Sequence, residues 1–185
     1  MRTLLPRSLF AKPVTIPEPR PDAQVVGGED AFLAELGRAL DVRARRLFGR
    51  SITIRMVDAG SCNGCELEIN ALNNSVYDIE RFGIKFAASP RHADVLLVTG
   101  PVTHNMRAAL ERTYAAMPDP KWVVAVGDCA GGCGVFAESY ATVGSVGKVV
   151  PVDLVIKGCP PKPIDLVKGL LALMEQATAK TKVAR

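Results

Sequence analysis

The sequence has few aromatic residues, no long apolar run and little net charge. Aromatic side chains make up 5% of the 185 residues, and Trp122 is the only tryptophan. A nucleic-acid platform that stacks bases on aromatic rings is therefore not expected. No apolar run approaches the roughly 18 residues that span a bilayer. The N-terminal segment contains Pro6 and no continuous apolar stretch, so it does not resemble a signal peptide.

Histidine is scarce as well, and this limits the kinds of catalysis that the chain can carry out alone. The two histidines are His92, in an expected surface loop, and His104, after the segment GPVT. Neither forms part of a recognisable nucleophile–base pair. The chain is therefore predicted to contain no complete active site of its own.

Short apolar strands alternate with helices from Ser51 onward. We predict strands at 52–57, 83–88, 93–99, 122–126 and 152–157, and helices at 64–74, 105–117 and 163–178. Continuous apolar strands separated by helices are typical of a parallel sheet that is covered on both faces. The predicted fold class is α/β, a flavodoxin-like doubly wound parallel sheet of four to five strands.

Two segments precede this domain and one follows it. Residues 1–27 hold five of the thirteen prolines, which predicts an extended arm; a tail without structure and an arm lying on a partner are both compatible with the composition. Residues 28–50 form an amphipathic helix with leucines on one face and arginines on the other, which could pack on its own domain, dock on another subunit or lie on a membrane surface. The domain itself is assigned to 51–178, and 179–185 to a basic tail.

Four of the five cysteines follow the ends of predicted strands. Cys62 and Cys65 come after the first strand, Cys129 after 122–126, and Cys159 after 152–157. The carboxyl ends of parallel strands meet at one edge of the sheet, where ligands of such folds collect. Glycines crowd the same loops and allow the backbone to approach a bulky ligand closely. We therefore interpret these four cysteines as the ligands of one [4Fe–4S] cluster.

Other interpretations of the cysteines explain less of the pattern. Core cysteines would lie inside elements and not in Gly-rich loops, and a thioredoxin-like C-x2-C pair would leave Cys129 and Cys159 unused. A zinc site with four thiolates is chemically possible, although only one C-x2-C pair is present. Cys133 is an alternative to Cys129 as third ligand. We favour Cys129 because it directly ends its strand, which makes Cys133 a neighbour of the site.

The motifs SCNGCELEI, GPVTHNM, MPDPKWVVAVGDC and VVPVDLVIKGCPPKP occur in this order between Ser51 and Glu175. Together they resemble the superfamily of [NiFe]-hydrogenase small subunits and the B (20 kDa) subunit of respiratory complex I. The spacing C-x2-C, where complex I has adjacent cysteines, and the short length resemble the membrane-bound group of formate hydrogenlyase and hydrogenase-4 type. Cys133 departs from the pattern, because relatives commonly have glycine at this position.

This resemblance implies an electron-transfer subunit that carries the proximal [4Fe–4S] cluster on Cys62, Cys65, Cys129 and Cys159. The implied partners are a large hydrogenase-like (NiFe) subunit, a ferredoxin-like iron–sulfur subunit and membrane-arm subunits, with the protein held peripherally on the cytoplasmic side of the cell membrane. The face around the Cys62–Glu68 loop would be buried against the large subunit. A complex I-like subunit that relays electrons to quinone is the alternative.

Two glutamates and a histidine lie close to the implied site. Glu66 and Glu68 flank the cysteine loop and either face the large subunit, where one could tune potential or proton flow, or form a solvated first helical turn. His104 near the rim could contact a partner or move protons. The sequence does not choose between these roles.

Overall fold

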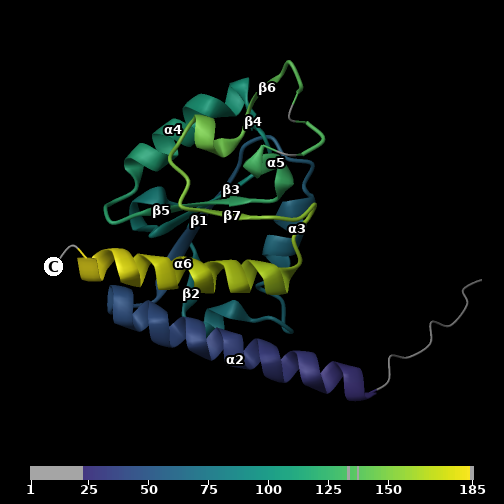
Figure 1. Ribbon diagram of the computed structural model, residues 1–185, viewed down its shortest axis with the longest axis vertical. Helices are drawn as coiled ribbons and strands as arrows, with labels where there is room; N and C mark the ends of the chain where they lie inside the picture. Colours follow the sequence, from purple (N-terminus) through teal and green to yellow (C-terminus); the bar gives the residue numbers. More distant parts are fainter. Residues whose placement is uncertain (1–22, 133, 137, 184–185) are drawn as a thin grey trace, which may run out of the picture.

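The computed structural model describes residues 23–132, 134–136 and 138–183. Its centre is a sheet of five parallel strands in the order β2-β1-β3-β5-β7 (Figure 1). The strands are β1 (Ile52–Asp58), β2 (Ile84–Phe86), β3 (Val95–Thr99), β5 (Trp122–Val126) and β7 (Leu154–Ile156). Counting only these strands, the order is 2-1-3-4-5, which is the flavodoxin-like order. The predicted fold class is confirmed, with five strands.

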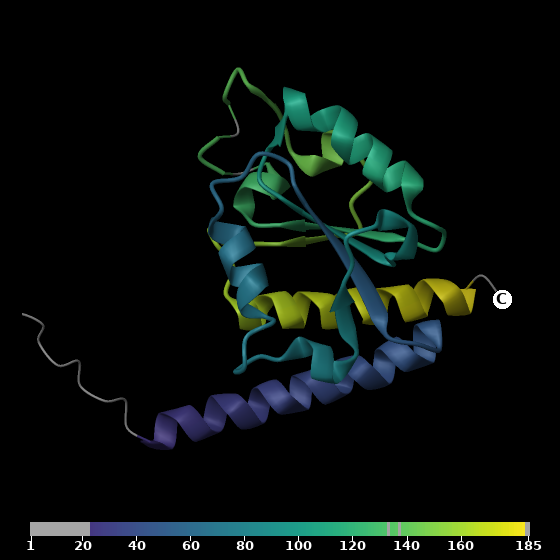
Figure 2. The same ribbon diagram turned by 180° about the vertical axis from the view of Figure 1, so that it is seen from behind.

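Helices cover both faces of this sheet. On one face, α2 (Ala23–Phe48) and α6 (Pro163–Val183) lie side by side, and the short α3 (Gly64–Ala71) lies near the start of α6 (Figures 1 and 2). On the other face lie α4 (His104–Ala116) and the one-turn α5 (Asp128–Gly131). The start of α4 is capped by Thr103, whose Oγ1 accepts a hydrogen bond from the Met106 N–H at 3.3 Å. Three 3-10 turns complete the connections, η1 (Ile79–Phe82), η2 (Pro90–His92) and η3 (Val146–Lys148).

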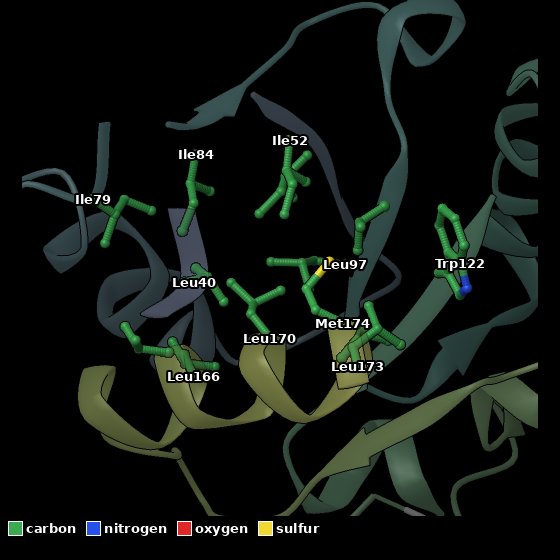
Figure 3. Packing of buried hydrophobic residues seen from close by; sticks show 14 of the residues in the cluster. Leu40, Ile52, Ile79, Ile84, Leu97, Trp122, Leu166, Leu170, Leu173 and Met174 are labelled. Carbon is green, nitrogen blue, oxygen red and sulfur yellow. The ribbon is translucent and has the colours of Figure 1, made fainter. Parts of the chain in front are cut away.

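Two apolar layers form on the two faces because neighbouring residues of a strand point to opposite sides. On β3, Leu97 belongs to the cluster that contains Leu40 of α2 and Leu170 of α6 (Figure 3), whereas Leu96 belongs to the cluster that contains Leu110 of α4. All five residues of β3 are buried. This explains why the strands of the sequence are continuously apolar and do not alternate.

The N-terminal helix packs on its own domain. Leu33, Leu40 and Ala44 of α2 are buried, and α2 runs along α6. The other uses of its apolar face, as a membrane-surface or subunit-docking helix, are not needed to explain these residues. No helix in the described part of the chain is long and apolar enough to cross a bilayer.

Several predicted boundaries were wrong. The helix α2 begins at Ala23, so residues 23–27, assigned to the extended arm, are helical; the rest of the arm lies outside the described residues. Helix α6 continues to Val183, so most of the assigned tail is helical too. A small antiparallel pair, β4 (Val102–Thr103) with β6 (Thr142–Gly144), was not predicted at all.

Candidate metal centre

The four strand-end cysteines come together at the carboxyl edge of the sheet. Cys62 and Cys65 follow β1, Cys129 lies in α5 after β5, and Cys159 follows β7. All four line one cavity of about 110 Å³. In Figures 1 and 2, α3 and α5 lie at the same end of the sheet, as this cavity requires. The predicted convergence of the four thiols is therefore present in the structure.

Short polar contacts fix the loops that carry these thiols. After β1, the Asp58 Oδ1 accepts hydrogen bonds from the N–H groups of Gly60 at 2.8 Å and Ser61 at 2.7 Å, which turns the chain towards Cys62. Between the other two loops, the Asp128 Oδ1 accepts from the Gly158 N–H at 2.9 Å, and the Gly158 carbonyl accepts from the Asp128 N–H at 3.0 Å. Each cysteine is thus attached to a loop that hydrogen bonds hold in place.

Two glycines lie so close to cysteine side chains that a side chain at either position would collide with them. A Cβ at Gly127, whose φ is 88°, would lie 2.7 Å from the Sγ of Cys65. A Cβ at Gly134 would meet the Cys129 side chain and would lie 2.6 Å from its Cα and 2.8 Å from its backbone nitrogen. A side chain at either position would occupy the space of a thiol.

The thiols also influence one another electrostatically. Burial raises the pKa of Cys65 to about 12, with smaller contributions from the negative charges of Glu66 and of the other three cysteines. Burial raises the pKa of Cys129 too, although the backbone N–H groups of Phe136 and Val135 act in the opposite direction by hydrogen bonding to its sulfur. Four thiolates packed in this way repel one another unless a cationic centre lies between them.

The donor set fits an iron–sulfur cluster. The cavity offers four thiols from separate loops and glycine-rich backbone around them, which are the features of [4Fe–4S] ligation. Within residues 23–132, 134–136 and 138–183, no group of three His, Cys, Asp or Glu side chains is arranged to hold a single metal ion. The assignment of these cysteines as cluster ligands stays a prediction, and Cys133 lies outside the described residues.

The acidic residues and histidines named from the sequence lie in different surroundings. Glu66 is only 5% exposed; its Oε2 accepts a hydrogen bond from the Ser61 Oγ at 2.6 Å, and its Oε1 is buried without a partner. The solvated helical turn expected as one alternative is therefore wrong for Glu66. Glu68 is half-buried, and His92 and His104 are exposed.

Sequence reasoning did not identify two residues that shape the site, Ser61 and Asp128. Both lie in the loop after a strand, between a glycine and a cysteine, in the segments GSC and GDC. Such a short polar residue between a glycine and a cysteine is the signal that could have found them, since Asp and Ser side chains often hydrogen-bond nearby backbone N–H groups.

Comparison with known proteins gives matches over most of the chain. The family described as NADH ubiquinone oxidoreductase, 20 Kd subunit, matches residues 62–173. A probable membrane-bound hydrogenase subunit of Pyrococcus furiosus is 44% identical over 137 residues, which cover 74% of this chain and 82% of that protein. Formate hydrogenlyase subunit 7 of Escherichia coli is 47% identical over 130 residues, which cover 69% of this chain and 51% of that protein.

A solved structure is similar as well. It is described as the membrane-bound sulfane sulfur reductase, an archaeal respiratory membrane complex. One of its chains matches with a TM-score of 0.62 and 35% sequence identity, over 80% of this chain and 76% of that one. The similarity therefore extends to the three-dimensional arrangement.

Proposed function

Because the chain belongs to the family of the 20 kDa subunit of NADH ubiquinone oxidoreductase, we propose that it is the electron-transfer small subunit of a membrane-bound [NiFe]-hydrogenase complex. The similarity to a membrane-bound hydrogenase subunit and to a formate hydrogenlyase subunit supports the hydrogenase branch. The observation that carries the proposal is the single cavity lined by Cys62, Cys65, Cys129 and Cys159.

These four thiolates would hold one [4Fe–4S] cluster. When bound, such a cluster supplies one-electron transfer at a potential set by its hydrogen bonds, charge and exposure. The protein contributes the thiolates, the backbone N–H groups of Val135 and Phe136 at the Cys129 sulfur, and the room that Gly127 and Gly134 leave. Its role is to bind the cluster and to fix its distance from a partner.

The exposed surface around the site suits a large partner subunit. Cys62 and Cys159 are exposed, and Leu67, Val135 and Val155 are large apolar side chains exposed by 61%, 87% and 42%. Apolar groups gathered beside a functional cavity are typical of a surface that another protein covers. We propose that a large hydrogenase-like subunit, where protons and H2 interconvert, covers this face, and that a ferredoxin-like subunit supplies electrons.

The complex as a whole would be attached to the membrane by other subunits. This chain would then lie peripherally, on the cytoplasmic side of the cell membrane, next to membrane-arm subunits. The relatives described as membrane-bound support this placement.

The second candidate is a complex I-like subunit that relays electrons to quinone. The observation in its favour is the family match itself, which carries the description of the NADH ubiquinone oxidoreductase subunit. Against it stands the spacing of Cys62 and Cys65, which are separated by two residues, as in the hydrogenase branch that the sequence resembles.

Low-temperature EPR on the anaerobically purified, dithionite-reduced complex tests the proposal, with iron, nickel and zinc quantified on the same sample. We expect a [4Fe–4S] signal, and nickel beside it. Iron without nickel would favour the quinone-linked candidate. Zinc without iron would overturn the electron-transfer function.

A further inference from the structure

A second cavity lies at the opposite end of α3 from the cysteine loop. It has a volume of about 250 Å³, and its lining includes Arg55 of β1, Asn70 of α3 and Phe86 of β2. Helix α3 carries Cys65 in its first turn and Asn70 in its last. They are five positions apart along the helix, which is about 7.5 Å along the axis. None of the cysteines that line the first cavity lines this one.

Arg55 brings an unpaired cation to this cavity. Its Nη1 donates to the Ala87 carbonyl at a long 3.5 Å, and its Nε is buried without any hydrogen-bond partner. Within the described residues, no aspartate or glutamate forms an ion pair with it, whereas Arg50 and Arg107 each have one. A buried donor on a charged group is unfavourable when nothing accepts from it. Arg55 therefore brings to this cavity a guanidinium that has no ion-pair partner among the described residues.

We propose that this cavity binds a carboxylate, which accepts hydrogen bonds from the Arg55 guanidinium. The Arg55 side chain lines the cavity, and an arginine guanidinium can donate two parallel N–H groups to the two oxygens of a carboxylate, a contact that is strong and specific. The remaining polar side chains are the neutral amides of Asn70 and Asn73, and Met56 and Phe86 supply apolar walls. One cation with neutral walls balances a single negative charge, so a doubly charged phosphate fits less well.

The position of the cavity indicates where the carboxylate comes from. Leu67 and Asn70 are three residues apart on α3, and both are exposed, so they lie on the same side of the helix. A subunit that covers Leu67 and the cysteine loop reaches the mouth of the cavity with its next side chains. We therefore assign the carboxylate to an aspartate or glutamate of that subunit, a step that rests on the proposed function. A free small carboxylate is the other source of the same chemistry.

Zero-length crosslinking of the purified complex tests the partner source. In the Arg55→Lys variant, a carbodiimide would join the new amine to a carboxylate within contact distance, and mass spectrometry of the peptides would identify it. We expect one crosslink from position 55 to an acidic residue of another subunit. The matched control is Arg112→Lys, an exposed position on α4 across the sheet, where no such crosslink is expected.

Titration of the full chain with acetate tests the free source, using ¹³C-labelled acetate and NMR. Saturable binding that disappears in Arg55→Gln and persists in Arg112→Gln would place a free carboxylate in the cavity. If the partner supplies the carboxylate, Arg55→Gln should weaken the affinity of this subunit for the assembled complex at least about tenfold. This is the effect expected for a lost charged hydrogen bond.

The outcomes separate this proposal from the proposed function. Either the crosslink or acetate binding that depends on Arg55 supports the carboxylate site. If neither is observed in a complex that retains its cluster iron and its EPR signal, the carboxylate site is overturned and the electron-transfer function stands. Absence of iron from the unmodified complex would instead contradict the proposed function, and the acetate titration would still test the carboxylate site.

Discussion

The two ends of the parallel sheet differ in how completely their polar groups are paired within the chain. At the amino end of β3, Asp94 is 4% exposed and fully paired. Its carboxylate accepts two hydrogen bonds from Arg50, at 3.0 and 2.6 Å, and a third from the Thr53 N–H at 2.9 Å. Every partner belongs to the same chain. Such a group stabilises the fold and needs nothing from outside.

The carboxyl end combines paired loop residues, such as Asp58 and Asp128, with groups that have no partner among the described residues. The two buried side-chain atoms without a partner in the described part of the chain are Arg55 Nε and Glu66 Oε1. Arg55 lies in the middle of β1, whereas Glu66 lies beside the cysteine loop at this end. Four free thiols lie there as well. The contrast indicates that the amino end is built for stability, whereas the carboxyl end is built for groups that the chain alone does not supply. The predictions below test this division.

The largest effect is expected from removing a thiol at the carboxyl end. In Cys65→Ser, the cavity loses one of its four thiolates, and we expect loss of the EPR signal of this [4Fe–4S] cluster and of the iron of one cluster per complex. Iron analysis and EPR on the purified complex measure this. Cys133→Ser is the matched control and should keep the signal. Retention of a full cluster in Cys65→Ser would contradict the assigned ligand set.

At the amino end, Asp94→Ala should lower stability without affecting metal content. It removes three hydrogen bonds and leaves the Thr53 N–H without its side-chain acceptor, while the half-exposed Arg50 returns to water. We expect the free energy of unfolding to fall by about 2–4 kcal/mol, measured by urea titration of the full chain. Glu111→Ala, which breaks a surface ion pair with Arg107, should cost only about 0.5 kcal/mol. Equal losses of unfolding free energy in both variants would show that Asp94 contributes no more to stability than a surface ion pair.

A smaller effect is expected at the loop beside Cys129. In Gly134→Ala, the added Cβ would lie 2.6 Å from the Cys129 Cα, so the loop must move and take the N–H groups of Val135 and Phe136 with it. Loss of these bonds to the sulfur makes the reduced, more negative state less favourable. The reduction potential should therefore fall, on the order of tens of millivolts.

A redox titration followed by EPR measures this shift. Gly147→Ala is the matched control, because nothing lies within 4 Å of a Cβ at that position. It should leave the potential unchanged. A potential that is the same in both variants would show that the loop does not act on the cluster.

Local signals account for much of what could be predicted from the sequence. The strand Trp122–Val126 and the start of α6 at Pro163 were predicted correctly, because continuous apolar runs and a proline in the first turn are local signals. The convergence of the four cysteines followed from the parallel direction of the strands, which brings their carboxyl ends together.

Other features depended on contacts that are distant in sequence. The pair β4–β6 joins Val102–Thr103 to Thr142–Gly144, and such short segments carry no periodic pattern. Helix α2 runs through Gly27 and Gly28, each of which costs about 1 kcal/mol relative to alanine in a helix and therefore indicated a boundary. The unpaired Nε of Arg55 and the burial of Glu66 could not be predicted from the sequence, because burial of a charged side chain depends on its neighbours in the fold.

The smallest effect is expected from Glu66, whose charge acts on Cys65. Burial is the main reason that the pKa of Cys65 rises to about 12, and the Glu66 charge is the next. Because the folded pKa lies above the ordinary 9.0, the cluster-free chain should lose stability from this group as pH rises from about 9 towards 12. In the same window, the thiol of the folded chain should resist alkylation.

Glu66→Gln should lower the pKa of Cys65 while burial still holds it above its ordinary value. Alkylation of Cys65 by iodoacetamide in the cluster-free chain at pH 9 should therefore become faster, by less than the factor of about ten that one pKa unit represents. Mass spectrometry of the Cys65 peptide measures the rate. Glu68→Gln removes an equal charge from the half-buried neighbour, which does not contribute to the shift, and should leave the rate unchanged. If both variants react at the rate of the unmodified chain, the buried Glu66 carboxylate does not influence the cysteine site through its charge.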